Sequence, residues 1–201
     1  MIDRLSLEGS KHPDFIGCWK MQDPSLCDHL IAFFESNKSK QRPGVSGDGQ
    51  VREAVKKSTD ITIAPHDLEN EKFHHVSAYI ERLKVCYLDY LEQWDFLKTF
   101  LPDVHIGSFN LQKYDQGGHF GELHSERTSL SGLHRTHVWM TYLNDVSDGG
   151  ETQFPMFGIT VKPEKGKTLI WPAEWTHAHF GAVVNKGSKY IITGWMHFPY
   201  P

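Results

Sequence analysis

The stretch Gly117–Glu126 (GGHFGELHSE) contains the residues around which the rest of the sequence is organised. His124 and Glu126 are two residues apart in a segment with the pattern of a β-strand, where residues i and i+2 point to the same face. An imidazole and a carboxylate in this arrangement can bind one metal ion. The pattern H-x-E is common by chance, so it indicates a metal site only if a further ligand is available.

A third ligand is available in the segment Trp175–Trp195 (WTHAHFGAVVNKGSKYIITGW). His177 and His179 are expected to alternate onto the same strand face, so either can supply it. Two histidines and one carboxylate with open coordination positions form the facial triad of non-haem Fe(II) sites. Lys189 begins the next apolar segment, and Thr193 lies on the same strand face. A lysine there can pair with the far carboxylate of a dicarboxylate that chelates the metal, although a lysine in such a turn is more often solvated.

Length and composition predict one globular domain, residues 1–201, with an ordinary balance of apolar and charged residues. The formal net charge of -4 argues against a nucleic-acid partner. No apolar run reaches the roughly 20 residues needed to span a bilayer, and the first ten residues lack an apolar signal segment. We therefore expect a cytoplasmic protein without a membrane partner. Cys18, Cys27 and Cys86 form no C-x-x-C pair, which predicts reduced and buried thiols.

Two helices are expected in the first half of the chain. Asp23 and Pro24 predict the N-cap and first residue of one helix, since its later apolar residues fall at helical spacing. From Asp67 to about Trp94, apolar residues recur at steps of three and four with charges between them, which predicts a long supporting helix. The segment before the first helix predicts an edge strand or an ordered arm. The Gly-rich run 41–50 predicts a loop that can act as a flap. We expect the loops around residues 44–49 and 119–121 to flank the substrate entrance, because binding sites commonly lie on loops held by a rigid scaffold.

The second half has a different pattern. From His105 onward, short apolar segments are separated by Gly-containing turns, which is typical of a β-sandwich or barrel. About seven or eight strands preceded by helices predict an α+β, mainly β protein. The expected fold is a double-stranded β-helix, or jelly roll, with N-terminal helices packed on one face. Residues 1–104 would form the helical support region and residues 105–201 the catalytic core.

Several motifs follow His105 in a recognisable order. Tyr114 precedes His124 by ten residues with glycines between them, and the segment Arg135–Thr152 ends in YLNDVSDGGET. A Val-x-Pro-x-x-Gly pattern (Val161, Pro163, Gly166) then leads into the apolar strand that precedes His177 and His179. The closing block contains His179, Gly181, Val183, Gly187, Lys189, Tyr190, Thr193 and Trp195. In these motifs the sequence resembles the 2-oxoglutarate- and Fe(II)-dependent dioxygenases, specifically their prolyl 4-hydroxylase-like branch.

The resemblance implies a role for each matched residue. His124, Glu126 and His179 would bind Fe(II), because the family spacing to the basic residue favours His179 over His177. The cofactor-binding residues would be Tyr114, Lys189, Thr193 and Trp195, with Lys189 and Thr193 anchoring the far carboxylate of 2-oxoglutarate. The family pattern has Asp where this chain has Glu126, and the longer side chain requires the backbone to sit further from the metal.

The implied reaction hydroxylates an unactivated C–H bond, with peptidyl proline as the leading substrate. It consumes O2 and 2-oxoglutarate and releases succinate and CO2, with ascorbate as an assisting reductant. A peptide or protein is the expected partner, a small molecule is an alternative substrate, and the sequence indicates no oligomeric state. A cupin-like jelly roll that binds metal without oxidation is the competing interpretation. It would keep the histidines but have no need of Lys189 with Thr193. A catalytically dead scaffold is disfavoured by the intact triad.

Overall fold

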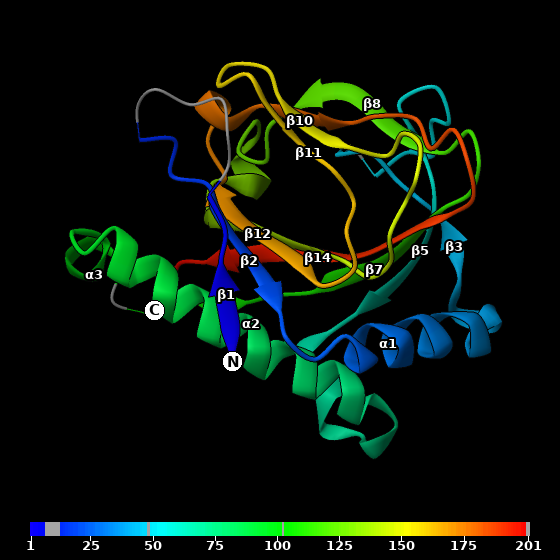
Figure 1. The fold of residues 1–201 in the computed structure, drawn as a ribbon, viewed down its shortest axis with the longest axis horizontal. Coiled ribbons are helices and arrows are strands. Elements are labelled where there is room, and N and C mark those ends of the chain that lie inside the picture. The colour runs from blue at the N-terminus through cyan, green and yellow to red at the C-terminus, as the bar shows by residue number, and fades with distance from the viewer. Residues whose placement is uncertain (7–12, 48, 102, 200–201) are drawn as a thin grey trace.

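Two antiparallel sheets form the body of the protein, and the computed structural model describes residues 1–6, 13–47, 49–101 and 103–199 (Figure 1). The larger sheet has the strand order β1 (Ile2–Arg4), β2 (Gly17–Met21), β12 (Lys167–Pro172), β9 (Arg135–Tyr142), β14 (Lys189–His197), β7 (Phe109–Tyr114), β5 (Thr59–Ile63), β3 (Arg42–Pro43), with β6 (His105–Ile106) also paired to β14. The smaller sheet has the order β11 (Ile159–Val161), β10 (Thr152–Phe154), β13 (His179–Gly181), β8 (His119–His124), β4 (Lys56–Lys57).

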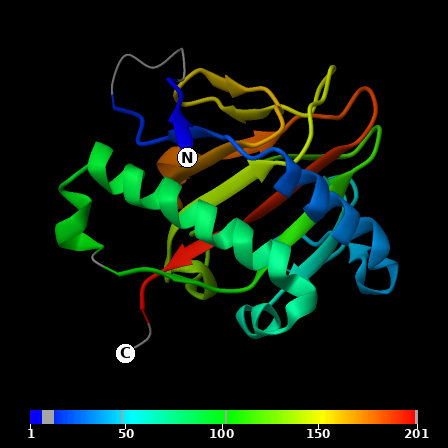
Figure 2. The same cartoon turned by 60° about the horizontal axis from the view of Figure 1, so that its bottom comes forward.

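The helices cover the outer face of the larger sheet, and the smaller sheet lies over its other face (Figures 1 and 2). Helix α1 spans Ser25–Ser36, α2 spans His74–Gln93, and the short α3 spans Leu97–Phe100. Leu30 and Phe34 of α1 and Val76 and Leu83 of α2 are buried in one core with residues from the sheet. This amphipathic stripe follows from the 3.6-residue helical period.

Each central strand of the larger sheet separates two cores. In β9, Trp139 packs toward the helices, whereas Val138 and Met140 belong to the core between the sheets. In β14, Ile192 packs toward the helices, and Ile191 faces the smaller sheet. Because side chains alternate along a strand, every second residue of β7, β9 and β14 is directed into the space between the sheets.

The expected α+β jelly roll with helices on one face is confirmed, but several element boundaries differ from the sequence predictions. Helix α2 begins at His74 rather than near Asp67, because two 3₁₀ helices, η2 (Pro65–Glu69) and η3 (Glu71–Phe73), occupy the preceding turns. The Asn70 side chain accepts a hydrogen bond from Lys72 N–H at 3.0 Å and begins η3 separately. The segment before α1 does contain an edge strand, β1, whereas β2 lies inside the sheet between β1 and β12.

The start of α1 agrees with the sequence prediction to within one residue. Pro24 occupies the N-cap position, and the Asp23 carboxylate accepts hydrogen bonds from the Ser25 N–H and hydroxyl at 3.1 and 2.5 Å. Asp23 therefore still satisfies a free donor of the first turn. The region 1–104 contributes strands β1 to β5 to the two sheets as well as the helices.

The three cysteines are free and buried, as predicted. Burial raises the pKa of Cys18 to about 12, of Cys27 to about 11 and of Cys86 to about 12. These thiols therefore stay protonated and serve as small apolar side chains. Among the residues that the structure describes, no helix is long and apolar enough to cross a membrane.

Candidate metal centre

Strand pairing in the smaller sheet brings the three predicted ligands together. His124 ends β8, Glu126 follows it in the chain, and His179 begins β13. The two strands pair antiparallel with His179 directly opposite His124, and their ring centroids are 4.5 Å apart. Residues that lie opposite each other in adjacent strands have neighbouring side chains, so the register itself assembles the cluster.

The ligand atoms of this cluster converge on one point. His124 Nε2 and His179 Nε2 each lie 3.7 Å from Glu126 Oε1, and one ligand atom from each residue lies within 4.8 Å of the others. His124 Nδ1–H donates to the Glu122 carbonyl at 2.8 Å, and His179 Nδ1–H donates to the His177 carbonyl at 3.0 Å. These hydrogen bonds orient both rings so that the Nε2 lone pair points toward the cluster. Metal-binding histidines commonly donate their other ring N–H to a carbonyl in this way.

Burial favours the neutral, metal-binding form of His179. His179 is buried, and the resulting desolvation, with a contribution from nearby His124, lowers its pKa to about 3. The His124 ring stacks on Phe120 at 3.8 Å, and the Trp171 ring meets His179 edge to face at 4.9 Å. Two neutral imidazoles and one carboxylate with packed rings fit a divalent metal ion of the non-haem iron type.

The second oxygen of the Glu126 carboxylate has protein partners. Trp195 Nε1–H donates to Oε2 at 2.9 Å, and Arg135 Nη1 lies 3.4 Å from the same oxygen. Trp195, which the sequence predicted to bind the cofactor, therefore contacts a candidate metal ligand directly. Arg135 was not identified from the sequence as a site residue.

His177 lies outside the cluster. It belongs to the 3₁₀ helix η5 (Trp175–His177), whose turn breaks strand alternation, so the expectation that His177 and His179 share one face is wrong. Its Nε2–H donates to the Asp14 carbonyl at 2.7 Å, and its Nδ1 accepts from the Thr176 hydroxyl at 2.9 Å. With both ring nitrogens occupied, His177 acts on the site through its carbonyl, which orients His179.

The cluster opens into a cleft of about 1310 Å³ between the sheets. Lys189, Thr193 and Trp195 of β14 line it on the same strand face, as the sequence predicts. Lys189 is buried, and burial lowers its pKa to about 8, opposed by the charge of Glu151. Its Nζ donates to the Gly150 carbonyl at 2.9 Å and lies 4.6 Å from the centre of the Tyr114 ring. The prediction of a solvated lysine is thereby excluded.

Thr193 and Tyr114, which were also predicted to bind the cofactor, form hydrogen bonds to other groups of the protein. The Thr193 hydroxyl donates to the Trp139 carbonyl at 2.9 Å and keeps its lone pairs for a donor in the cleft. The buried Tyr114 hydroxyl donates to Gln112 Oε1 at 2.7 Å. Burial, with the nearby Asp60 charge, raises the pKa of Tyr114 well above its usual value. Both side chains line the cleft.

A polar wall that the sequence did not reveal continues from Tyr114. Asp60 of β5 accepts from Lys56 Nζ at 2.6 Å, from Gln112 Nε2 at 3.1 Å and from the Ser58 hydroxyl at 2.8 Å. Lys56 and Asp60 form a buried ion pair, and both line the cleft. Because the pair is satisfied on both sides, it fixes the shape of the wall rather than leaving a free charge.

Two predicted entrance segments have different structures. Val45, Ser46, Gly47 and Gly49 line the cleft as predicted for a loop near its mouth. Residues 119–121 are not a loop, because they belong to β8 and pair with β4 and β13. His119 is absent from the cleft wall among the described residues, and its Nδ1 accepts from Gly121 N–H at 3.1 Å.

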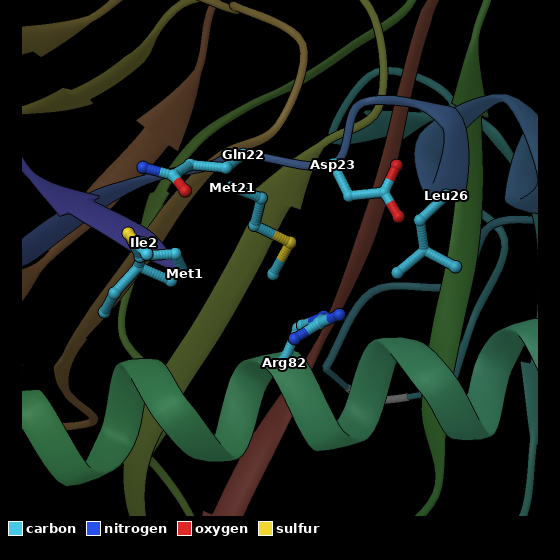
Figure 3. Close-up of a pocket in the computed structure, with 7 residues that line it drawn as sticks. All are labelled: Met1, Ile2, Met21, Gln22, Asp23, Leu26 and Arg82. Carbon is cyan, nitrogen blue, oxygen red and sulfur yellow. The ribbon is translucent and has the colours of Figure 1, made fainter.

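A separate hollow of about 130 Å³ lies where β1, the end of β2, and the two long helices meet (Figure 3). Its polar side chains include Asp23, which is already bonded to Ser25, and Arg82, which extends from α2 toward the hollow. The hollow shares no lining residue with the cleft.

Comparison with known proteins identifies relatives over most of the chain. A sequence model of the family described as "2OG-Fe(II) oxygenase superfamily" matches residues 109–197. Prolyl 4-hydroxylase 2 of Arabidopsis thaliana is 26% identical over 204 residues, covering 85% of this chain and 62% of that protein. A solved Pseudomonas putida prolyl-4-hydroxylase has a TM-score of 0.68 at 18% identity and covers 92% of this chain and 94% of that chain. A Trichoplax adhaerens prolyl hydroxylase, solved with a hypoxia inducible factor peptide fragment, has a TM-score of 0.68 at 12% identity, covering 92% and 84%.

These matches differ in what they establish. The chain spans between 47% and 63% of the length of the four Arabidopsis relatives it matches. At their low identities, the two solved structures establish the jelly-roll fold. The family match covers the strands that contain His124, His179 and Lys189. The family match over residues 109–197, the prolyl 4-hydroxylase relatives and the solved prolyl hydroxylases together support a 2OG-Fe(II) oxygenase of the prolyl 4-hydroxylase-like branch.

Proposed function

We propose that the protein is an Fe(II)- and 2-oxoglutarate-dependent oxygenase that hydroxylates an unactivated C–H bond of a peptidyl proline. The observation that carries this proposal is the position of two features in one cleft. The side chains of His124, Glu126 and His179 converge on one point of the cleft, and the buried cation Lys189 lines the same cleft. A metal site alone does not require a buried lysine, whereas a dicarboxylate co-substrate does.

The protein's own residues have separate roles in this proposal. His124, Glu126 and His179 would hold Fe(II), as a donor set of two imidazoles and one carboxylate. The Lys189 ammonium pairs with the far carboxylate of 2-oxoglutarate, exchanging its contact with the Gly150 carbonyl for a charge-assisted hydrogen bond. When bound, the iron, 2-oxoglutarate and O2 supply the oxidation, in which 2-oxoglutarate loses CO2 to become succinate and one oxygen atom enters the substrate.

The size and polar lining of the cleft favour a peptide substrate. Besides the residues around the metal cluster, Asn110, Thr62 and Arg42 of the neighbouring strands β7, β5 and β3 line the cleft, whose volume is about 1310 Å³. The sequence relatives of the chain include proteins named as prolyl 4-hydroxylases, and one structural neighbour was solved with a peptide fragment. A peptide with a proline placed over the metal is therefore the substrate class that we propose.

The test is incubation of the purified protein with Fe(II), ascorbate, 2-oxoglutarate and proline-rich peptides. We expect succinate release in proportion to peptide oxidation and a peptide mass increase of one oxygen atom. A Lys189→Ala variant should lose turnover at limiting 2-oxoglutarate. Metal binding without 2-oxoglutarate binding would instead support a cupin-like metal protein. Succinate release with an amino acid but with none of the peptides would agree with the proposed oxygenase activity and contradict the proposed peptide substrate.

A further inference from the structure

The carboxylate of Glu126 is divided between two tasks. Its Oε1 atom lies 3.7 Å from both histidine Nε2 atoms, whereas its Oε2 atom accepts from Trp195 Nε1–H at 2.9 Å. Arg135 Nη1 also donates to the Glu126 main-chain carbonyl at 3.1 Å and lies 3.4 Å from Oε2. The arginine thus holds the backbone of this residue, and together with the tryptophan it holds one carboxylate oxygen.

The two partners of Glu126 also hold each other. The Arg135 guanidinium carbon lies 3.8 Å from the centre of the Trp195 ring, within the range of a cation–π contact. Arg135 begins β9 and Trp195 lies in β14, next to a register shift between Met196 and His197. Such irregularities redirect side chains relative to a regular ladder. The pair is therefore fixed by the central strands of the larger sheet, while Glu126 follows a strand of the smaller sheet.

We propose that Arg135 and Trp195 are positioning residues that make a glutamate usable as the carboxylate ligand of this site. They bind Oε2 and leave Oε1 as the single oxygen presented to the metal. An aspartate has one methylene fewer, so its carboxylate cannot both reach the metal position and accept from the Trp195 N–H. This inference rests on the proposed metal site and explains how the chain functions with Glu in place of the Asp of the family pattern.

The experiment measures Mn(II) affinity without 2-oxoglutarate or substrate, and uses Co(II) absorption to report the geometry of the ligand set. Arg135→Met removes the donors but keeps a long side chain on the Trp195 ring, and Trp195→Phe removes the N–H but keeps the ring. Each should weaken Mn(II) binding by about 10- to 100-fold, the usual effect of losing a group that orients a ligand. Arg135→Lys, which keeps a charged donor, should recover part of the loss.

Arg127→Met is the matched control. Arg127 lies in the same segment but pairs with Glu174 and does not line the cleft, so its variant should bind Mn(II) like wild type. Thermal unfolding of all variants shows whether each one is folded. If Arg135→Met fails to fold, Trp195→Phe, which leaves the arginine in place, decides the same question.

The decisive comparison places each substitution in a Glu126→Asp background. If the clamp serves the glutamate, adding Arg135→Met or Trp195→Phe to the aspartate variant should change affinity by less than about threefold, a strong non-additivity for residues in contact. Equal losses in both backgrounds, or no loss with Glu126 present, would overturn the inference. A wild-type protein that binds no metal would instead contradict the proposed metal site itself, so the two failures are distinguishable.

Discussion

Lys189 is a buried cation next to an aromatic ring, a backbone carbonyl and an open cleft. Removal of one member of a buried charge pair typically costs about 2–5 kcal/mol. We expect Lys189→Ala to raise the dissociation constant for 2-oxoglutarate at least about tenfold, at the low end of that range because water can enter the cleft. Isothermal titration of the Mn(II)-loaded protein measures this. Wild-type affinity in the variant would remove the main reason for assigning a dicarboxylate to the cleft.

The pKa of Lys189 predicts a pH dependence. In the free protein this pKa is lowered to about 8, chiefly by burial. A bound carboxylate stabilises the charged form and raises the pKa again, so binding favours the protonated lysine. Affinity for 2-oxoglutarate should therefore be nearly constant below about pH 8 and fall by up to about tenfold per pH unit above it.

Lys189→Arg separates this effect from other titrations. A guanidinium remains charged throughout this range, so the variant should bind 2-oxoglutarate without the decline at high pH, even if its planar fork lowers the affinity overall. Titrations between about pH 7 and about pH 9 provide the comparison. The same decline in both proteins would assign the pH dependence to a group other than Lys189.

Residue chemistry was the best predicted part of the site. Strand alternation predicted that His124 and Glu126 share one face. The two residues do converge, but β8 ends at His124, so Glu126 reaches the cluster from the segment after the strand. Arg135 could not be found in this way, because it reaches Glu126 from another sheet and an arginine at the start of a strand has no distinctive pattern. His177 was ambiguous because a 3₁₀ turn, invisible in the alternation of residues, rotates it away from His179.

At the scale of elements, the Gly149–Gly150 turn supplies the carbonyl that holds Lys189. Gly149 has φ +78°, and a Cβ there would lie 2.1 Å from the Val183 carbonyl oxygen. Gly149→Ala should lower the free energy of unfolding by about 1–3 kcal/mol from backbone strain, with an added steric cost. Urea denaturation measures the change.

Gly187 provides the control for this turn. It has φ +77°, but a Cβ there would meet no atom within 4 Å. Gly187→Ala therefore reports the backbone strain alone, about 1–2 kcal/mol for a left-handed alanine. The Gly149 variant should be clearly less stable than the Gly187 variant. Equal stabilities would contradict a tight packing of the turn against Val183.

The loop that includes Val45 to Gly49 lies on the cleft wall, and binding sites commonly use loops held on a rigid scaffold. We expect trypsin to cut after the exposed Arg52 and to cut more slowly when metal, 2-oxoglutarate and a true peptide substrate are present together. The same protein with metal and 2-oxoglutarate but no peptide is the control. Unchanged cleavage with a verified substrate would argue against closure of this loop.

Element type was predicted better than element boundaries. The strands after His105 were clear because turn glycines separate them, and several of those glycines have positive φ. The start of α2 was placed too early, because the apolar spacing continues through two 3₁₀ turns that the Asn70 side chain helps to define. Short strands such as β3 and β4 have no pattern of their own and form by pairing with neighbours distant in sequence.

At the scale of the whole molecule, the two sheets divide the chemistry. The smaller sheet and Glu126, two residues beyond the end of β8, provide the metal cluster, whereas the larger sheet provides Lys189, Thr193 and Trp195. Helices α1, α2 and α3 support the larger sheet from its outer face, and none of their described residues lines the cleft. The relative position of the two sheets therefore determines whether metal and co-substrate sites meet in one cleft.

The central claim, that His124, Glu126 and His179 form the complete protein ligand set, is tested most directly by metal stoichiometry. Equilibrium dialysis with Mn(II), under conditions that saturate the wild-type protein, should give one ion per chain for wild type and for His177→Ala. It should give none for His179→Ala. Equal loss from both variants, or loss from His177→Ala alone, would contradict the assignment of the metal centre.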